Sequence, residues 1–167
     1  MKYKIEHKFV GSFEESVHFL TEENFYDPKN LPNVQDSKPL IEEVTEDYKF
    51  WKTQWSAHGQ IPKLVQHLIQ PKMLSWIEET RYDRKAKTYH TKITPFFFRS
   101  VFHCENRGYF TKLNDREFLR VNDGVLDIKI PVFGPFIEEV IIKHLRENFE
   151  NEYRYSYKIV KERYGVG

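Results

Sequence analysis

A glutamate placed among large apolar residues is the side chain in this sequence best suited to chemistry. Residues 72–82 alternate as in a β-strand, with Trp76, Glu78 and Tyr82 on one face. A carboxyl group in an apolar environment has a raised pKa, because burial disfavours its charged form. Glu78 could therefore act as a general acid or base, or bind the polar end of an otherwise apolar ligand.

Two other interpretations of this segment stay open at the level of sequence. In the opposite register, Glu79 takes the place of Glu78 among the apolar side chains. Either carboxylate could also be a strand residue with a purely structural role, paired with Arg81 or Lys92.

The sequence contains no recognisable catalytic or cofactor-binding motif. None of its 7 histidines is spaced with a cysteine or carboxylate as metal ligands are. His103 and Cys104 are adjacent, so in a strand their side chains would point to opposite faces and make a poor dyad. A Gly-rich phosphate loop and the Gly-x-Ser-x-Gly nucleophile motif are both missing. These observations predict no metal and no cofactor, and they favour a binding protein over an enzyme.

Composition and charge are typical of one intracellular globular domain. A chain of 167 residues with a net charge of +1 can build a sizeable core and has no charge excess that would favour nucleic acid. Its single cysteine rules out an internal disulfide and fits a reducing compartment. No signal-peptide pattern is visible, and no apolar run approaches the ~18 residues of a membrane span. We expect one domain over residues 1–167, located in the cytoplasm.

Aromatic residues are unusually abundant. The sequence contains 14 Phe, 10 Tyr and 3 Trp, together 16% of all residues. Such large and rigid side chains can fill a core, or they can line a cavity that smaller side chains leave open. Composition alone does not choose between these alternatives.

The first part of the chain predicts a strand followed by one or two short helices. His7 lies on the apolar face of the alternating residues 2–9, where it is either a structural histidine or a polar anchor for a ligand. Ser12, with Glu15 three residues later, has the pattern of a capping box for the first helix. Residues 21–25 could form the second.

Six further strands are expected between residues 40 and 130. They comprise residues 40–45, 48–57, 72–82, 87–94, 95–113 and 116–130. Residues 48–57 allow two registers, of which the one that places Trp51 and Trp55 inward is favoured. The turn signal Asn122-Asp123-Gly124 lies inside the last strand and indicates a β-bulge or, alternatively, a hairpin.

Residues 61–69, between two of these strands, predict a short amphipathic helix. Pro62 suits a helix start, and Leu64, Val65 and Ile69 belong to one apolar stripe. The helix could pack on the sheet, close an opening as a mobile lid, or touch a membrane transiently through residues 64–69.

The last third of the chain predicts a long helix that needs a wide apolar surface. Gly134 allows a turn, and Pro135 suits the first helical position. A helix of about 29 residues, roughly 43 Å long, can follow. Its apolar stripe includes Ile137, Ile141 and Leu145, and a curved antiparallel sheet is its natural partner.

The order of elements resembles that of the START-like (SRPBCC) superfamily. Residues 124–138, Gly-Val-Leu-Asp-Ile-Lys-Ile-Pro-Val-Phe-Gly-Pro-Phe-Ile-Glu, are most similar to a bacterial family of unknown function within it. The segment that begins Ile61-Pro62 is also similar to one in the PRELI-like phospholipid-transfer proteins. The resemblance implies the helix-grip α+β fold, in which a curved antiparallel sheet of about six or seven strands wraps around a long C-terminal helix, with short helices after the first strand.

The same resemblance implies a deep cavity for an apolar ligand, often a lipid, sterol or polyketide. We expect its wall to contain Trp51, Trp55, Trp76, Tyr89, Ile93, Phe102, Ile137, Ile141 and Leu145. Glu78 and His7 are the candidate polar anchors.

The leading hypothesis from the sequence is a non-catalytic binder or carrier of a lipid-like molecule, with no nucleic-acid partner. One alternative is a cyclase- or dehydratase-type enzyme that uses Glu78. Another is a co-chaperone-like module that binds a protein through the outer face of the sheet. The sequence makes no prediction of the oligomeric state.

Overall fold

Seven antiparallel strands form one curved sheet in the computed structural model, which describes residues 1–23, 25–32, 34–57, 62–70 and 73–165. The strands are β1 (Lys2–Val10), β2 (Val34–Val44), β3 (Tyr48–Ala57), β4 (Ser75–Asp83), β5 (Thr88–Pro95), β6 (Phe102–Lys112) and β7 (Glu117–Ile128). Their order in the sheet is β1-β7-β6-β5-β4-β3-β2. Consecutive strands from β2 to β7 are therefore neighbours, and β1 pairs with the last strand.

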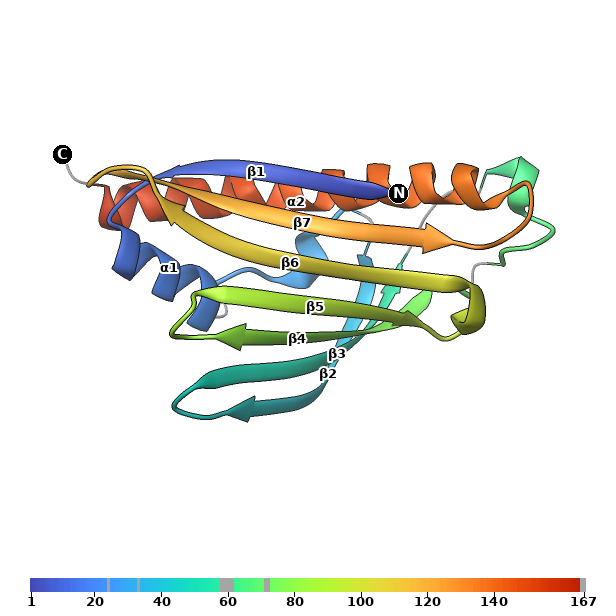
Figure 1. The fold of residues 1–167 in the computed structure, drawn as a ribbon, viewed down its shortest axis with the longest axis horizontal. Coiled ribbons are helices and arrows are strands. Elements are labelled where there is room, and N and C mark those ends of the chain that lie inside the picture. The colour runs from blue at the N-terminus through green and yellow to red at the C-terminus, as the bar shows by residue number, and fades with distance from the viewer. Residues whose placement is uncertain (24, 33, 58–61, 71–72, 166–167) are drawn as a thin grey trace.

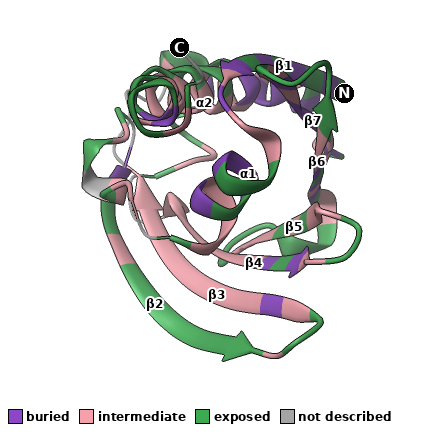
Figure 2. Ribbon diagram, turned by 90° about the vertical axis from the view of Figure 1, so that its left-hand side faces the viewer, coloured by how far each residue is buried: buried purple, intermediate pink, exposed green. Residues whose placement is uncertain are grey.

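The helices lie on the inner side of this sheet. The described residues contain α1 (Phe13–Glu22), α2 (Gly134–Tyr164) and the short 3₁₀ helices η1 (Pro28–Asn30), η2 (Lys63–Val65) and η4 (Arg99–Val101). α2 runs along β1 and β7 (Figure 1). The sheet curls from β1 round to β2, with α1 inside the curve (Figure 2). The α+β helix-grip architecture predicted from the sequence is confirmed.

The core is concentrated where α2 meets β1 and β7. Every second residue of β1 is buried, as its alternation predicts, and Leu126 and Ile128 of β7 lie beside Ile137 and Ile142 of α2. Full burial of one such side chain stabilises the fold by about 1.5–3 kcal/mol. α2 begins close to β7, because the buried Glu138 carboxylate accepts a hydrogen bond of 2.9 Å from the Ile128 backbone amide.

A second core holds α1 against the far end of α2. Phe9 and Phe118 from the sheet are fully buried with Phe19 of α1 and Val160 of α2. The rings of Phe9 and Phe118 stack at 5.1 Å between centroids. Together the two cores fix both ends of α2 and leave its middle facing the curve of the sheet.

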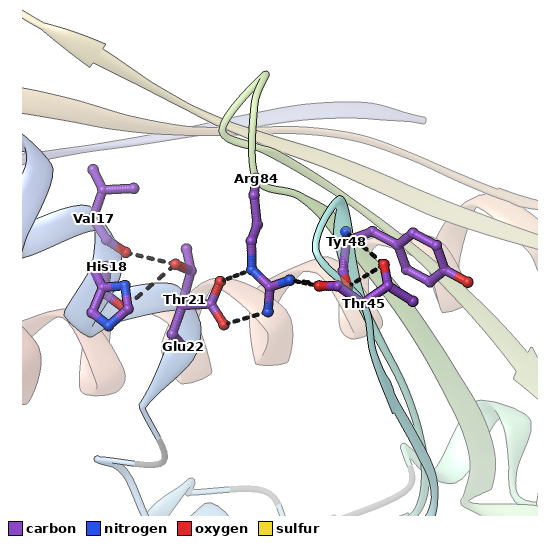
Figure 3. Close-up of polar contacts among 7 residues, drawn as sticks. All are labelled: Val17, His18, Thr21, Glu22, Thr45, Tyr48 and Arg84. Atoms are coloured by element: carbon purple, nitrogen blue, oxygen red, sulfur yellow. Dashed lines mark hydrogen bonds and ion pairs between the residues drawn. The ribbon is translucent and has the colours of Figure 1, made fainter.

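The side chain of an arginine connects α1 to the β2–β3 turn (Figure 3). Arg84, in the β4–β5 turn, donates two hydrogen bonds to the carboxylate of Glu22, at 2.7 and 3.1 Å. It also donates to the backbone carbonyls of Thr45 and Tyr48 in the β2–β3 turn. One guanidinium thus joins three segments that are far apart in the sequence.

The prediction of a bulge or hairpin at Asn122-Asp123-Gly124 is wrong. These residues lie within β7, and the pairing with β1 and β6 continues through them without a shift. Asn122 is buried and accepts hydrogen bonds from Asn106 on the neighbouring strand β6 and from Tyr89 on β5, one strand further. A Cβ at Gly124 would lie 2.0 Å from the Tyr3 ring, so glycine is needed for packing rather than for a turn.

The predicted helix over residues 61–69 is also wrong for the part that the structure describes, which excludes residue 61. Only the 3₁₀ turn η2 forms, followed by irregular turns. Val65 is buried, whereas Leu64, its neighbour in the predicted stripe, is exposed. A stretch of barely two helical turns gains too little from its own hydrogen bonds to override the packing of Val65 into the core.

Several element boundaries near the N-terminus differ from the sequence prediction. The Ser12 side chain makes no capping hydrogen bond, so the capping box does not form. Thr21 lies inside α1 and donates to the Val17 carbonyl instead of capping a second helix. β2 begins at Val34, six residues before the predicted start at Leu40, because an edge strand tolerates Pro39.

The long strand predicted over residues 95–113 is interrupted. β5 extends to Pro95, and the chain then turns through residues 96–98 and η4 before β6 begins at Phe102. Phe98 has a φ of 60°, which breaks the extended conformation. The three consecutive phenylalanines therefore form a connection between strands.

Candidate functional site

A cavity of about 1060 Å³ lies between the sheet and α2. Its lining comes from all seven described strands and both α-helices, and most of it is apolar. Ligand pockets in proteins typically measure about 300–1,000 Å³, whereas ordinary interiors have few voids larger than a water molecule. The volume is therefore comparable to that of known ligand pockets and too large for a packing defect.

The tryptophans of β3 and β4 form one wall of this cavity. The antiparallel register pairs Trp55 with Trp76 and places Trp51 opposite Thr80. The rings of Trp55 and Trp76 stack with their centroids 6.4 Å apart. All three tryptophans of the chain line the cavity, so the register that places Trp51 and Trp55 inward is the observed one.

Glu78 lies on the same wall, between Thr53 of β3 and Ile93 of β5. Burial raises the pKa of its carboxyl group to about 7, and the neighbouring Trp76 side chain offsets only part of this rise. Glu79 instead pairs with Lys52 at 3.3 Å, across the strands on the opposite face of β4. Of the two adjacent glutamates of β4, it is therefore Glu78, not Glu79, that lines the cavity.

The remaining wall residues expected from the sequence also line the cavity. Tyr89, Ile93 and Phe102 come from β5 and β6, and Ile137, Ile141 and Leu145 come from the first half of α2. Tyr89 donates a hydrogen bond of 2.5 Å to Asn122, and burial raises its pKa to about 12. Its hydroxyl group is thus uncharged and committed to the protein.

His7 does not belong to the cavity lining, contrary to the expectation that it could anchor a ligand. Its ring is 3% exposed and stacks on Tyr153 at 4.2 Å. The arrangement fits the Nε2–H tautomer, in which Nε2 donates to Glu150 at 2.7 Å and Nδ1 accepts from Arg120 at 3.2 Å. Burial lowers the pKa of His7 despite the Glu150 contact. His7 is a structural histidine between β1 and α2.

Arg120 is a lining residue that the sequence analysis did not single out. Its guanidinium is buried and donates a hydrogen bond of 2.8 Å to Glu152, which also lines the cavity. Burial is the largest single influence and lowers the pKa of Arg120, but the Glu152 carboxylate and the nearby tyrosines Tyr89 and Tyr153 together raise it on balance. The alternation of β7 could have placed Arg120 inward, because it shares one strand face with Phe118, which is apolar. Asn122 lies on the same face, and all three side chains are buried.

Comparison with known proteins identifies the architecture. No family model matches the sequence, and no curated protein matches it. Among solved structures, TTHA0849 from Thermus thermophilus superimposes with a TM-score of 0.66 at 17% identity, over 96% of this chain and 97% of its own. A START superfamily protein from Mycobacterium smegmatis gives a TM-score of 0.60 at 14% identity, over 95% and 98%. This chain has the START-like, helix-grip fold.

An enzyme shares the START-like fold with this chain. The Zhui aromatase/cyclase from a Streptomyces species superimposes with a TM-score of 0.58 at 12% identity, over 99% of this chain and 100% of its own. At these identities the similarity shows the fold alone. Function has to be argued from the residues inside the cavity.

The cavity wall contains a histidine, His144, as well as the carboxyl groups and Cys104. Among the described residues, no cluster of three or more His, Cys, Asp or Glu could hold a metal ion. Cys104 lines the cavity, but burial raises the pKa of its thiol to about 12.

No helix in the described ranges is long and apolar enough to cross a membrane.

Proposed function

We propose that this protein binds and carries a hydrophobic, lipid-like small molecule in the cavity between its sheet and α2, without catalysing a reaction. The observation that carries the proposal is the size of a mostly apolar cavity, whose wall includes the Glu78 carboxyl group with a pKa of about 7. Dispersion contacts are lost along every wall of an empty cavity, so an apolar occupant would stabilise the fold.

The polar groups of the cavity suggest what the ligand looks like. Two influences shift the pKa of Glu78, namely burial and the Trp76 side chain, and neither is a charged partner. Near neutral pH Glu78 can donate a hydrogen bond as an acid or accept one as a carboxylate. An apolar body with one hydroxyl, carbonyl or carboxyl group fits this wall, because the ligand's polar group would then be satisfied on burial.

Catalysis is disfavoured for three of the other polar groups in the cavity wall. The Tyr89 hydroxyl donates to Asn122, Arg120 is paired with Glu152, and the Cys104 thiol stays protonated. Tyr89, Arg120 and Cys104 are therefore poor partners for Glu78 in catalysis. The single buried cysteine is consistent with the cytoplasm, which we propose as the location.

A cyclase- or dehydratase-type enzyme is the second candidate. The specific observation in its favour is the pKa of Glu78, since a general acid or base works best with a pKa near the operating pH. Replacing Glu78 with Gln separates the candidates. If the protein is a carrier, the variant should still bind an apolar ligand, with a changed pH dependence of the affinity. If it is an enzyme that depends on Glu78, the variant should lose turnover by at least about 100-fold.

The tryptophans make the carrier proposal directly testable. A fatty acid with a dansyl group in the cavity would lie beside Trp51, Trp55 and Trp76, and excitation of the tryptophans should then produce dansyl emission that saturates at one ligand per chain. The variant Ile141→Phe/Leu145→Phe narrows the cavity and should weaken binding. Arg154→Phe, on the exposed side of α2, is the matched control and should bind normally. Equal binding by all three proteins would contradict a site in the cavity.

A further inference from the structure

One end of the molecule exposes a group of apolar side chains, which we call the apolar tip. Its members, with their exposed fractions, are Leu64 (57%), Phe96 (37%), Phe97 (40%), Phe98 (42%) and Val132 (87%). Water-exposed phenylalanines cost solvation free energy, and three in succession in a six-residue connection between strands are a concentrated patch.

Three connections bring these residues to the same end (Figure 1). The Lys129 amide, before Val132, donates a hydrogen bond of 2.8 Å to the Val101 carbonyl in the β5–β6 connection. The ring of His67, after η2, meets the ring of Phe133 edge-on at 5.5 Å. The β5–β6 and η2 connections therefore both contact the β7–α2 connection.

The backbone holds two tip residues in a conformation that bulky side chains avoid. Phe98 has a φ of 60° and Val132 a φ of 70°. Such values are genuine outliers for aromatic and β-branched residues. Unusual conformations of this kind are concentrated at functional sites.

The charged residues in the connections that carry the apolar tip are basic. The three connections, residues 62–70, 96–101 and 129–133, contain Lys63, Arg99 and Lys129 and no acidic residue. Asp127, just before the last connection, lies 4.0 Å from Lys129, whose side chain is 77% exposed. A chain with a net charge of only +1 thus has a local excess of positive charge beside its exposed phenylalanines.

The apolar tip is continuous with the cavity. Val65 and Ile69, beside Leu64, line the cavity from the η2 segment. Pro95 and Phe102 line it from the two ends of the β5–β6 connection. The same segments that expose apolar groups to solvent therefore form the cavity wall on their inner side.

We propose that the apolar tip docks this protein onto the surface of an anionic lipid bilayer. Aromatic side chains partition into the membrane interface, and basic residues beside them are attracted to anionic headgroups. The contact differs from the one the sequence suggested over residues 64–69. Val65 and Ile69 face the cavity, so Phe96, Phe97 and Phe98 provide most of the apolar surface.

Vesicle co-sedimentation of the full chain tests the proposal. We expect binding to vesicles of phosphatidylcholine with about 30% phosphatidylglycerol, and binding about tenfold weaker to phosphatidylcholine alone. Phe96→Ser/Phe97→Ser should weaken binding to the anionic vesicles by about tenfold or more. Arg99→Gln/Lys129→Gln should reduce the preference for anionic vesicles. Leu113→Ser, which removes an equally exposed apolar residue from the β6–β7 turn, is the matched control and should bind like the unchanged protein.

Three results would overturn the proposal. One is the absence of sedimentation with anionic vesicles. Another is equal loss for Leu113→Ser and Phe96→Ser/Phe97→Ser. The third is a dimer in solution that the phenylalanine substitutions dissociate, since the patch would then be covered by a second copy. Vesicle binding does not depend on which ligand the cavity holds, so its failure would leave the carrier proposal to the fluorescence titration.

Discussion

Glu78 is the residue on which the chemistry of the cavity depends. Its side chain faces the cavity from the middle of β4, and its pKa of about 7 results mainly from burial. In the folded protein the proton is held up to a pH of about 7, whereas the ordinary value for the group is 4.5. The folded state therefore binds more protons than the unfolded chain between these values, and stability falls as the pH rises through this range.

The variant Glu78→Gln should remove this pH dependence. We expect it to be more stable than the unchanged protein by about 3 kcal/mol at a pH of about 8, and similar to it near a pH of about 4. Urea unfolding at the two pH values measures the difference. Glu79→Gln is the matched control on the outer face, where loss of an exposed ion pair changes stability by less than about 1 kcal/mol. An advantage of Glu78→Gln that is the same at both pH values would contradict a raised pKa.

The sequence predicted the position of Glu78 better than that of His7. Alternation assigns a side chain to one face of a strand, and both residues lie on the inner face as expected. It does not say whether that part of the face meets the cavity or the packed helix. His7 meets α2, where Tyr153, Glu150 and Arg120 surround it, and these partners are more than 100 residues away in the sequence.

At the scale of elements, the hydrogen bonds of Arg84 connect α1 to the β2–β3 turn (Figure 3). Arg84 lowers the pKa of Glu22, so the stabilisation is present above the ordinary pKa of a carboxyl group and is lost as the pH falls through the lowered value. A double-mutant cycle with Arg84→Met and Glu22→Gln should give a coupling free energy of about 1 kcal/mol at neutral pH. The coupling should decrease in acid, below the lowered pKa. No coupling at neutral pH would mean that α1 is held by apolar packing alone.

Close contact between β5 and β6 depends on Gly108. A Cβ there would lie 1.9 Å from the Tyr89 ring, so Gly108→Ala must displace that ring from Asn122. We expect a loss of about 1–3 kcal/mol in the free energy of unfolding, measured by chemical denaturation. Adding Tyr89→Leu should make the loss smaller than the sum of the two single effects. Strict additivity would show that the ring and the glycine do not interact.

The sequence predicted elements with a regular period and missed those fixed by tertiary contacts. β1, α1 and α2 follow from their alternation or helical spacing. Asn122-Asp123-Gly124 resembles a turn locally, but Tyr89 and Asn106 donate hydrogen bonds to the buried side-chain oxygen of Asn122, and the Tyr3 ring covers the glycine. Such contacts join strands whose pairing a local pattern does not reveal.

For the whole molecule, the order of elements was sufficient to predict the START-like fold. The cavity was implied by that resemblance and not by composition, since 16% aromatic residues could equally have filled a core. Its volume depends on how far the sheet curls away from the middle of α2, which is a property of the assembled structure. A few of the residues that line it, Val65, Ile69, Pro95 and Phe102, lie in or next to the connections that carry the apolar tip. Membrane docking is therefore proposed for one end of the cavity.

Native mass spectrometry of the purified protein tests the central claim, that the cavity holds an apolar molecule. We expect the intact chain to carry one small molecule, or to acquire one from a panel of lipids, and organic extraction should release it for identification. The narrowed variant Ile141→Phe/Leu145→Phe should lose the bound mass while remaining folded. A chain that stays at its bare mass of 20.3 kDa throughout the panel, with no thermal stabilisation by any lipid, would contradict the proposed function.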